Sequence, residues 1–324
     1  MTERICVTHH LPGERFRQLQ ETCELALWEG PGLVGPAALR GLLVGCRGLI
    51  CLLTDRIDAA LLASAPDLAF VSSMSVGVDH VDVAALTARG IPLGHTPGVL
   101  VETTADTTFA LLLAAARRVA EADAFVRAGK WTADRAWAPE FFVGADVGGA
   151  TLGIIGLGAI GQAVARRARG FGMRVLGWNR TPREVSGVES VALEQVLQQS
   201  DFVSLHVALA AETRNLLDAA RIGMMKPGSV VVNTARGGVL DETALACALA
   251  EGRLAAAGID VFEREPVAAD NPLLQLPNVV LAPHIGSATR KTRARMADMA
   301  VENALAALAG QRMPHCFNPA VYPR

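Results

Sequence analysis

The sequence predicts an α/β protein made of two domains, each with a doubly wound parallel sheet. Strand-like and helix-like segments alternate along most of the 324 residues, which is typical of parallel strands joined by helices. A GxGxxG turn begins at Gly156, in the middle of the chain, so the residues before it must form a unit of their own. With 51% hydrophobic residues, the chain can bury the two cores that this arrangement requires.

Residues 1–97 are predicted to form the smaller domain, with a flavodoxin-like fold. Its expected strands span residues 5–8, 48–53 and 68–72, and its expected helices span residues 14–22, 37–43 and 59–65. The turn Thr96-Pro97-Gly98 ends this domain. One long helix with a continuous apolar face is expected to follow, over residues 103–129.

The turn of Gly156, Gly158 and Gly161 is predicted to bind the pyrophosphate of a dinucleotide. An apolar run before it reads as a buried strand, and a helical apolar pattern follows it. The first glycine permits the tight turn, the second lets the backbone approach the phosphates, and the third lets the helix pack closely on the strand. Ala159 and Ile160 lie at the N-terminus of this helix, which attracts the anion.

The residue that ends the next strand, near Val175, indicates which dinucleotide is bound. A fold specific for NAD normally offers Asp or Glu at this place, where it bonds the ribose hydroxyls. Here the place is held by Asn179, followed by Arg180 and Thr181, which cannot repel a 2′-phosphate and can bind one. The sequence favours NADP(H), and NAD(H) stays possible if Arg180 is only a solvated turn residue.

The larger domain is predicted to be a Rossmann-type dinucleotide-binding domain over residues 98–285. Its further strands are expected at residues 202–206, 229–233, 256–260 and 279–282, with a helix at 244–251. A last amphipathic helix over residues 288–309 can return the chain to the first domain, so residues 286–324 are assigned to it. The active site is expected in the cleft between the two domains.

Composition and charge are typical of a cytoplasmic enzyme. Thirty Lys and Arg residues and 32 Asp and Glu residues are interspersed without a basic stripe, so neither nucleic acid nor a membrane is an expected partner. The most apolar stretch, residues 109–116, is too short to cross a bilayer. The six cysteines form no CxxC pair or zinc-like cluster, so a reducing compartment and no metal site are expected.

Three polar residues follow predicted strands of the larger domain, at the sheet edge where such folds bind ligands. Arg236 can grip a carboxylate bidentately, and His284 suits proton exchange near neutral pH. Glu265 is the candidate carboxylate partner that lets His284 act as an acid. Taken singly, each could be an ordinary surface, loop or structural residue, but their positions after successive strands predict one catalytic site.

Three longer motifs resemble the signatures of the D-isomer-specific 2-hydroxyacid dehydrogenases. They are Val230-Val-Val-Asn-Thr-Ala-Arg-Gly-Gly-Val-Leu-Asp-Glu242, Gly258-Ile-Asp-Val-Phe-Glu-Arg-Glu-Pro266 and Pro283-His-Ile-Gly-Ser287. The resemblance implies that Arg236 orients a 2-oxo acid, that His284 protonates its carbonyl oxygen and that Glu265 holds His284. It also implies cofactor contacts from Thr234, Ala235, Asp260, His284 and Gly286, and substrate contacts from Arg236, His284 and Ser287.

Within this family, the segments 72–80 and 96–106 resemble the glyoxylate/hydroxypyruvate reductase branch. This implies that the backbone amides of Val76 and Gly77 bind the substrate carboxylate, and that NADPH reduces glyoxylate or hydroxypyruvate to glycolate or D-glycerate. Two positions depart from the family's pattern, because Asp106 stands where Glu is common and Ala208 where Pro is frequent. Neither belongs to the proposed proton or carboxylate chemistry.

Other functions stay open from the sequence. A member of the same family could act on phosphite, D-lactate or a bulkier 2-oxo acid, and the segments 122–129 and 283–288 also suit phosphite oxidation. A nucleotide-sensing scaffold similar to the C-terminal-binding-protein corepressors is the alternative outside enzymes. The resemblance also implies a homodimer, in which the region of Trp131 and Trp137 reaches toward the neighbouring active site. Both tryptophans could equally be ordinary core or surface-covering aromatics.

Overall fold

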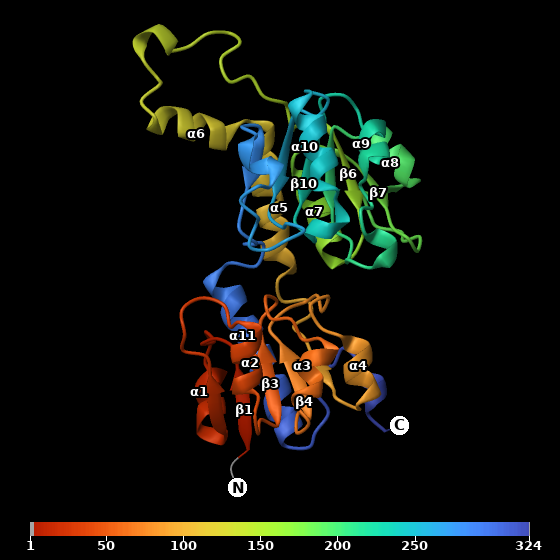
Figure 1. Cartoon of the computed structure of the whole chain (residues 1–324). Coiled ribbons are helices and arrows are strands. Elements are labelled where there is room, and N and C mark those ends of the chain that lie inside the picture. Colours follow the sequence, from red (N-terminus) through yellow and green to blue (C-terminus); the bar gives the residue numbers. More distant parts are fainter. Residues whose placement is uncertain (1–2, 324) are drawn as a thin grey trace. The chain divides into compact units, whose positions relative to one another are not determined.

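A computed structural model describes residues 3–323 and divides into two compact units (Figure 1). Unit 1 contains the residues up to Leu100 and those from Ala288 onward, and unit 2 is Val101–Ser287. Strands pair in parallel within both sheets, which confirms the predicted α/β class. The boundaries fall a few residues after those expected at 97/98 and 285/286. Within residues 3–323, no helix is both long and apolar enough to cross a membrane.

Unit 1 contains a five-stranded sheet with the order β2-β1-β3-β4-β5, which is that of flavodoxin-like folds. Its strands are β1 (Arg4–Val7), β2 (Glu24–Leu27), β3 (Gly48–Cys51), β4 (Phe70–Ser73) and β5 (Leu93–Gly94). One face is covered by α1 (Arg15–Thr22) and α11 (Arg290–Leu308), and the other by α2 (Pro36–Leu42), α3 (Ala59–Ala63) and α4 (Val83–Ala88). The sequence does not predict β2 and β5, which are the two edge strands of the sheet.

Unit 2 contains a seven-stranded sheet with the order β12-β11-β10-β9-β6-β7-β8. Its strands are β6 (Thr151–Ile155), β7 (Arg174–Trp178), β8 (Glu189–Ser190), β9 (Phe202–Leu205), β10 (Val230–Asn233), β11 (Ala256–Ile259) and β12 (Val279–Leu281). Its helices are α5 (Val101–Ala116), α6 (Val119–Arg127), α7 (Ala159–Gly170), α8 (Leu193–Gln199), α9 (Ala219–Met224) and α10 (Glu242–Ala250). This is the strand order of dinucleotide-binding folds with one strand added. The chain forms β6, β7 and β8 toward one edge of the sheet, and it then returns to the other side of β6 to form β9, so the strand order reverses between β6 and β9.

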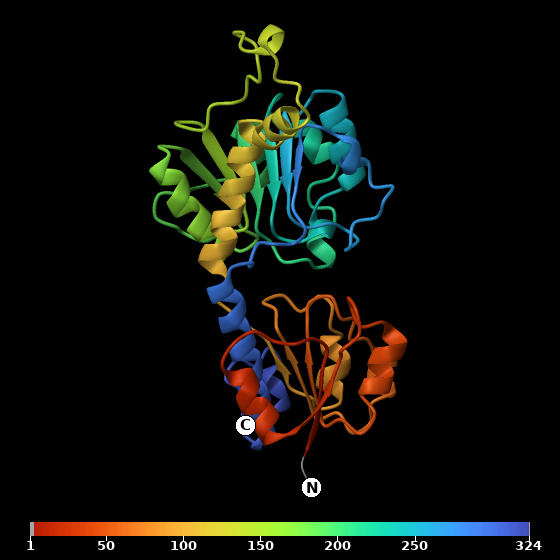
Figure 2. The ribbon, with the colours of Figure 1, turned by 90° about the vertical axis from the view of Figure 1, so that its left-hand side faces the viewer.

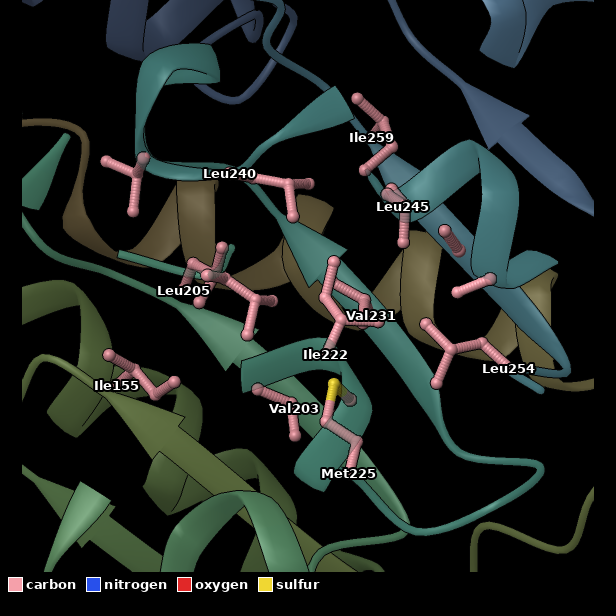
Figure 3. Packing of buried hydrophobic residues seen from close by; sticks show 14 of the residues in the cluster. Ile155, Val203, Leu205, Ile222, Met225, Val231, Leu240, Leu245, Leu254 and Ile259 are labelled. Atoms are coloured by element: carbon pink, nitrogen blue, oxygen red, sulfur yellow. The ribbon is translucent and has the colours of Figure 1, made fainter. Parts of the chain in front are cut away.

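Apolar side chains cover both faces of the unit 2 sheet. In β10, Val231 joins the cluster formed with α8, α9 and α10, whereas Val230 and Val232 join the cluster formed with α5 and α7. Figure 2 shows α5 lying across the second face. Figure 3 shows the first cluster, in which Val203 of the sheet and Leu245 of α10 both point into the packed layer. Such continuously apolar strands are expected where a parallel sheet is buried on both sides.

The single helix predicted over residues 103–129 is wrong, because the structure has two helices, α5 and α6. The chain turns at Arg118, whose backbone is left-handed with a φ of 54°. The N–H of Ala145 bonds to the carbonyl of Ala116 at 2.9 Å and so occupies an acceptor that a continuing helix would use. Helix α6 buries none of its side chains, and Figure 1 shows it extending away from the unit 2 sheet.

Candidate active site

The glycine turn connects β6 to α7 at the point where the strand order of unit 2 reverses. Gly156 has a φ of 105°, and a Cβ at this position would lie 2.5 Å from the carbonyl oxygen of His206. A Cβ on Gly161 would lie 2.0 Å from the oxygen of Gly156, whereas a Cβ on Gly158 would meet nothing within 4 Å. Two glycines are therefore needed by the turn itself, while Gly158 borders open space. This open side of Gly158 lies at the N-terminus of α7, where a helix attracts anions such as a phosphate.

Asn179, directly after β7, braces the glycine turn. Its Oδ1 accepts a hydrogen bond from the N–H of Leu157 at 3.1 Å, and its Nδ2 donates to the carbonyl of Thr181 at 2.7 Å. The side chain of Arg180 is 73% exposed. Arg183, for which the sequence gives no signal, donates to the carbonyl of Leu157 at 3.2 Å. Two arginines therefore stand close in sequence after β7, and one of them contacts the turn.

His284 and Glu265 form the pair that the sequence predicts. Nδ1 of His284 lies 2.6 Å from Oε2 of Glu265, and about a quarter of each side chain is exposed. Burial would raise the pKa of Glu265, but the hydrogen bond and charge of His284, the N–H of Phe262 and the charge of Arg236 together lower it. The ionised carboxylate places the ring proton on Nδ1, so that Nε2 is the atom suited to exchange a proton with a substrate.

Asp260 shapes the turn that carries His284. Its carbonyl accepts the N–H of His284 at 2.8 Å, and its carboxylate accepts the N–H groups of Ile285 and Gly286 at 2.7 and 2.8 Å. These bonds hold His284 at a φ of 55°, which is uncommon for a residue with a Cβ. Burial raises the pKa of Asp260, while the two amides act in the opposite direction. Ser287, the next residue along the chain, is also buried.

Arg236 follows β10 in a loop that the buried side chain of Asn233 shapes. Oδ1 of Asn233 accepts the N–H of Ala235 at 3.0 Å, and its Nδ2 donates to the carbonyl of Arg236 at 3.0 Å. A Cβ on Gly237 would lie 1.8 Å from the carbonyl carbon of Phe262, so only glycine permits this approach. The arginine loop therefore packs directly against the loop that carries Glu265.

Two further polar side chains near these loops, Glu242 and Thr234, are buried. Glu242, at the start of α10 and 8% exposed, accepts the N–H of Glu263 at 2.5 Å and a hydrogen bond from the amide of Asn271. Thr234, predicted as a cofactor contact, is buried with its hydroxyl 2.8 Å from that of Thr108. The sequence gives no signal for Glu242, because an acidic residue in the first turn of a helix usually faces solvent.

Val76 and Gly77, predicted to bind the substrate carboxylate, lie in unit 1 between β4 and α4. Both are half-buried. Side chains bond to the backbone of their loop: Oγ of Ser75 donates to the carbonyl of Gly77 at 2.7 Å, and Nδ1 of His95 lies 3.1 Å from the carbonyl of Val76. The loop is thus bonded to one of its own side chains, Ser75, and to His95.

Asp106 and the two tryptophans, which the sequence also singles out, have exposed side chains. Asp106 is exposed, and its carboxylate pairs with Arg167 at 2.6 Å, which joins α5 to α7. Trp131 and Trp137 are 59% and 80% exposed, so neither is a core residue. Among residues 3–323, no group of three or more His, Cys, Asp or Glu residues could hold a metal ion.

A parallel sheet with this strand order, a glycine turn at its reversal point and a His-carboxylate pair define the class of nicotinamide-dependent oxidoreductases. Residues 109–286 match the D-isomer specific 2-hydroxyacid dehydrogenase NAD binding domain. The chain is 49% identical to a glyoxylate reductase of Korarchaeum cryptofilum over 325 residues, covering 99% of this chain and 97% of that protein.

Solved structures agree with this match. The TT0316 protein from Thermus thermophilus has a TM-score of 0.91 at 48% identity, with 97% of this chain and 99% of that chain covered. An NADPH-dependent glyoxylate/hydroxypyruvate reductase from Sinorhizobium meliloti, in complex with NADP and malonate, has a TM-score of 0.89 at 32% identity, with 100% and 99% covered. The chain belongs to the D-isomer-specific 2-hydroxyacid dehydrogenase family. It is an enzyme of 2-oxo and 2-hydroxy acids with a nicotinamide-dinucleotide-binding domain.

Proposed function

We propose that the chain reduces glyoxylate and hydroxypyruvate to glycolate and D-glycerate with NADPH. The 2.6 Å pair of His284 and Glu265, packed beside the loop of Arg236, is the observation that carries the proposal. A proton donor and a carboxylate-binding cation then meet at the edge of the dinucleotide-binding sheet. Relatives named glyoxylate reductase, at 49% and 43% identity over nearly the whole chain, support a small substrate.

Each residue has a distinct role in this reaction. The guanidinium of Arg236 binds the carboxylate and carbonyl oxygens, and the amides of Val76 and Gly77 bind the carboxylate. His284 donates its proton from Nε2 to the carbonyl oxygen, and the ionised Glu265 stabilises the charged imidazole. The nicotinamide, when bound, supplies the hydride that reduces the carbonyl carbon. Thr234, Ala235, Asp260 and Gly286 position the nicotinamide end, and Ser287 adjoins the substrate.

The preference for NADPH is proposed from the residues after β7. Position 179 carries a neutral amide, so it does not repel a 2′-phosphate as Asp or Glu at this position would, and its oxygen bonds the N–H of Leu157. The exposed guanidinium of Arg180 lies 3.9 Å from the carboxylate of Glu212, a weak surface pair that a phosphate can displace. Arg180 and the hydroxyl of Thr181 are therefore suited to bind the 2′-phosphate.

A steady-state screen tests the substrate and the cofactor together. Glyoxylate, hydroxypyruvate, pyruvate, 2-oxoisovalerate and phenylpyruvate are assayed with NADPH and with NADH, and phosphite is assayed with NADP⁺. We expect the highest kcat/KM for the two small hydrophilic oxo acids with NADPH. Higher kcat/KM with phosphite or a bulky oxo acid would replace the proposed substrate, and no turnover with any of them would favour a nucleotide-sensing scaffold.

The cofactor preference is tested by the R180A variant. We expect KM for NADPH to rise and KM for NADH to stay unchanged, because only NADPH carries the 2′-phosphate. R174A is a matched control, since Arg174 begins the same strand and pairs with Glu189 at 2.8 Å. An equal effect of R180A on both nucleotides would contradict the assignment.

A homodimer is proposed from the surface of α6 and the segment after it. Val119 and Val126 on α6, together with Trp131, Trp137 and Val143, are each more than half exposed. Large apolar side chains that are this exposed are suited to contact with a second copy of the chain. Light scattering of the wild type and of V126E tests this: we expect a dimer and a shift toward monomer. A monomeric wild type would overturn it.

A further inference from the structure

The loop that carries Val76 and Gly77 has a hydrogen-bond donor on each of three successive carbonyls. The carbonyl of Ser75 accepts the N–H of Thr96 at 2.8 Å, and the carbonyl of Gly77 accepts the hydroxyl of Ser75 at 2.7 Å. Between them, the carbonyl of Val76 lies 3.1 Å from Nδ1 of His95. A carbonyl only accepts, so Nδ1 of His95 must carry the proton and donate it.

Each of these hydrogen bonds to a carbonyl also affects the N–H on the opposite side of the same peptide unit. The carbonyl of one residue and the N–H of the next belong to a single planar peptide unit. A donor on the carbonyl of Val76 therefore fixes the plane of the N–H of Gly77 and makes that N–H a stronger donor, because linked hydrogen bonds polarise one another. The bond from Thr96 to Ser75 does the same for the N–H of Val76.

Contacts of its backbone and of its ring hold His95 in place. Its backbone N–H bonds to the carbonyl of His315 at 3.0 Å, and its carbonyl accepts the amide of the buried Asn303 at 3.1 Å. Its ring packs edge-on against Phe317, with 5.2 Å between the ring centroids. Burial lowers the pKa of His95, with the charge of His315 acting in the same direction and the bond to Val76 against it. The neutral ring, with its proton on Nδ1, is the form that suits this bond.

A second chain of hydrogen bonds holds the other end of the loop. The hydroxyl of Ser75 donates to Gly77, so it must accept the bond that joins it to the hydroxyl of Ser73 at 2.7 Å. Ser73 in turn accepts from Nε2 of His80 at 2.9 Å. One direction of donation, from His80 through two serines to the Gly77 carbonyl, satisfies every member. These hydrogen bonds therefore fix the orientation of the loop's peptide planes before a substrate binds.

We propose that His95 is a positioning residue, which uses its Nδ1–H to orient and polarise the Val76–Gly77 peptide so that the Gly77 N–H binds the substrate carboxylate. The proposal rests on the proposed 2-oxo acid reduction, in which this loop meets the carboxylate. Preorganised amides lose little entropy on binding, so the contribution of His95 belongs to substrate affinity more than to proton transfer.

Two variants separate the hydrogen bond from the packing of the ring. H95F keeps an aromatic ring against Phe317 but has no donor, whereas H95N keeps a donor at the position of Nδ1 and loses the ring. We expect H95F to raise KM for glyoxylate about five- to tenfold, as loss of one buried hydrogen bond does. The kcat and the Kd for NADPH should stay close to those of the wild type. H95N should restore KM toward the wild-type value. An unchanged KM in H95F, or an equal rise in both variants, would overturn the role of the donor.

A second measurement does not depend on activity. In protein labelled with ¹⁵N-glycine, the amide resonance of Gly77 should move in H95F and return toward its wild-type position in H95N. A resonance that H95F leaves unmoved would overturn the assignment of His95 even if the enzyme reduces glyoxylate. A wild type that reduces no oxo acid, with the resonance responding as expected, would instead overturn the proposed function and leave only the orientation of the peptide by His95.

Discussion

Asp260 bonds to His284 through its backbone carbonyl and to the two residues after His284 through its side chain. The carbonyl of Asp260 accepts the N–H of His284, and its carboxylate accepts the amides of the next two residues, Ile285 and Gly286. The orientation of the imidazole is therefore set by a buried residue after β11 as well as by its own chain segment. The left-handed backbone of His284 persists because these bonds over-determine it.

The variant D260N tests this arrangement. Its amide group would present N–H atoms to one of the two backbone donors, so one buried donor would lose its acceptor. We expect the free energy of unfolding to fall by about 1–3 kcal/mol and kcat to fall with it, because His284 would shift. Chemical denaturation and steady-state kinetics measure the two effects. D218N is the control: Asp218 accepts the N–H of Arg221 at the start of α9, and asparagine caps a helix equally well. A D260N enzyme with wild-type kcat would contradict the role of Asp260 in positioning His284.

The variant E265Q tests the charge beside His284. The ionised carboxylate of Glu265 stabilises the positive charge that His284 carries as a proton donor, and the neutral amide of E265Q removes that stabilisation. We expect the alkaline fall in the rate of glyoxylate reduction to move to lower pH. The acidic fall in glycolate oxidation should move in the same direction. Profiles of kcat/KM against pH in both directions check this, and identical profiles for the two enzymes would refute it.

The same pair also makes a prediction about stability. The pKa of Glu265 is lowered in the folded chain, so its stabilising contribution is present above the pKa of an unfolded glutamate. That contribution is lost as the pH falls through the lowered value in the folded state. The difference in Tm between wild type and E265Q should therefore be largest near neutral pH and shrink in acid. A difference that grows on acidification would mean that the carboxylate is not held ionised.

Substitutions of Arg236 and of His284 should change different kinetic constants. In R236K the charge remains but the two-pronged contact is lost, so kcat/KM for glyoxylate should fall about 10- to 100-fold, with KM raised. In H284N the proton donor is lost, so kcat should fall ~10²–10⁴-fold while the Kd for NADPH is kept. Steady-state kinetics and fluorescence titration with NADPH separate the two. A higher KM without loss of kcat in H284N would show that His284 binds substrate instead of donating a proton.

Local patterns were sufficient for much of the fold and for the contact between His284 and Glu265. The strands that lead to Arg236 and His284 are continuous apolar runs, and the glycine spacing is specific for a strand-turn-helix unit. The break after Ala116 could not be predicted, because its cause is a bond from Ala145, which is distant in the sequence. The same limit applies to Glu242 and His95, whose importance depends on burial against loops that the sequence does not place beside them.

Two of the three glycines of the turn, Gly158 and Gly161, give the sharpest separation between folding and cofactor binding. G161A places a Cβ against the oxygen of Gly156, so we expect a loss of about 1–3 kcal/mol in the free energy of unfolding. G158A adds its Cβ to open space at an ordinary φ of −69°, so its Tm should match that of the wild type. If the pyrophosphate occupies that space, the Kd of G158A for NADPH should rise at least about tenfold, equivalent to ~1.4 kcal/mol. Isothermal titration and thermal melts decide between the outcomes. A stable G158A that binds NADPH normally would show that the phosphates do not approach Gly158, and that the turn has its shape for packing alone.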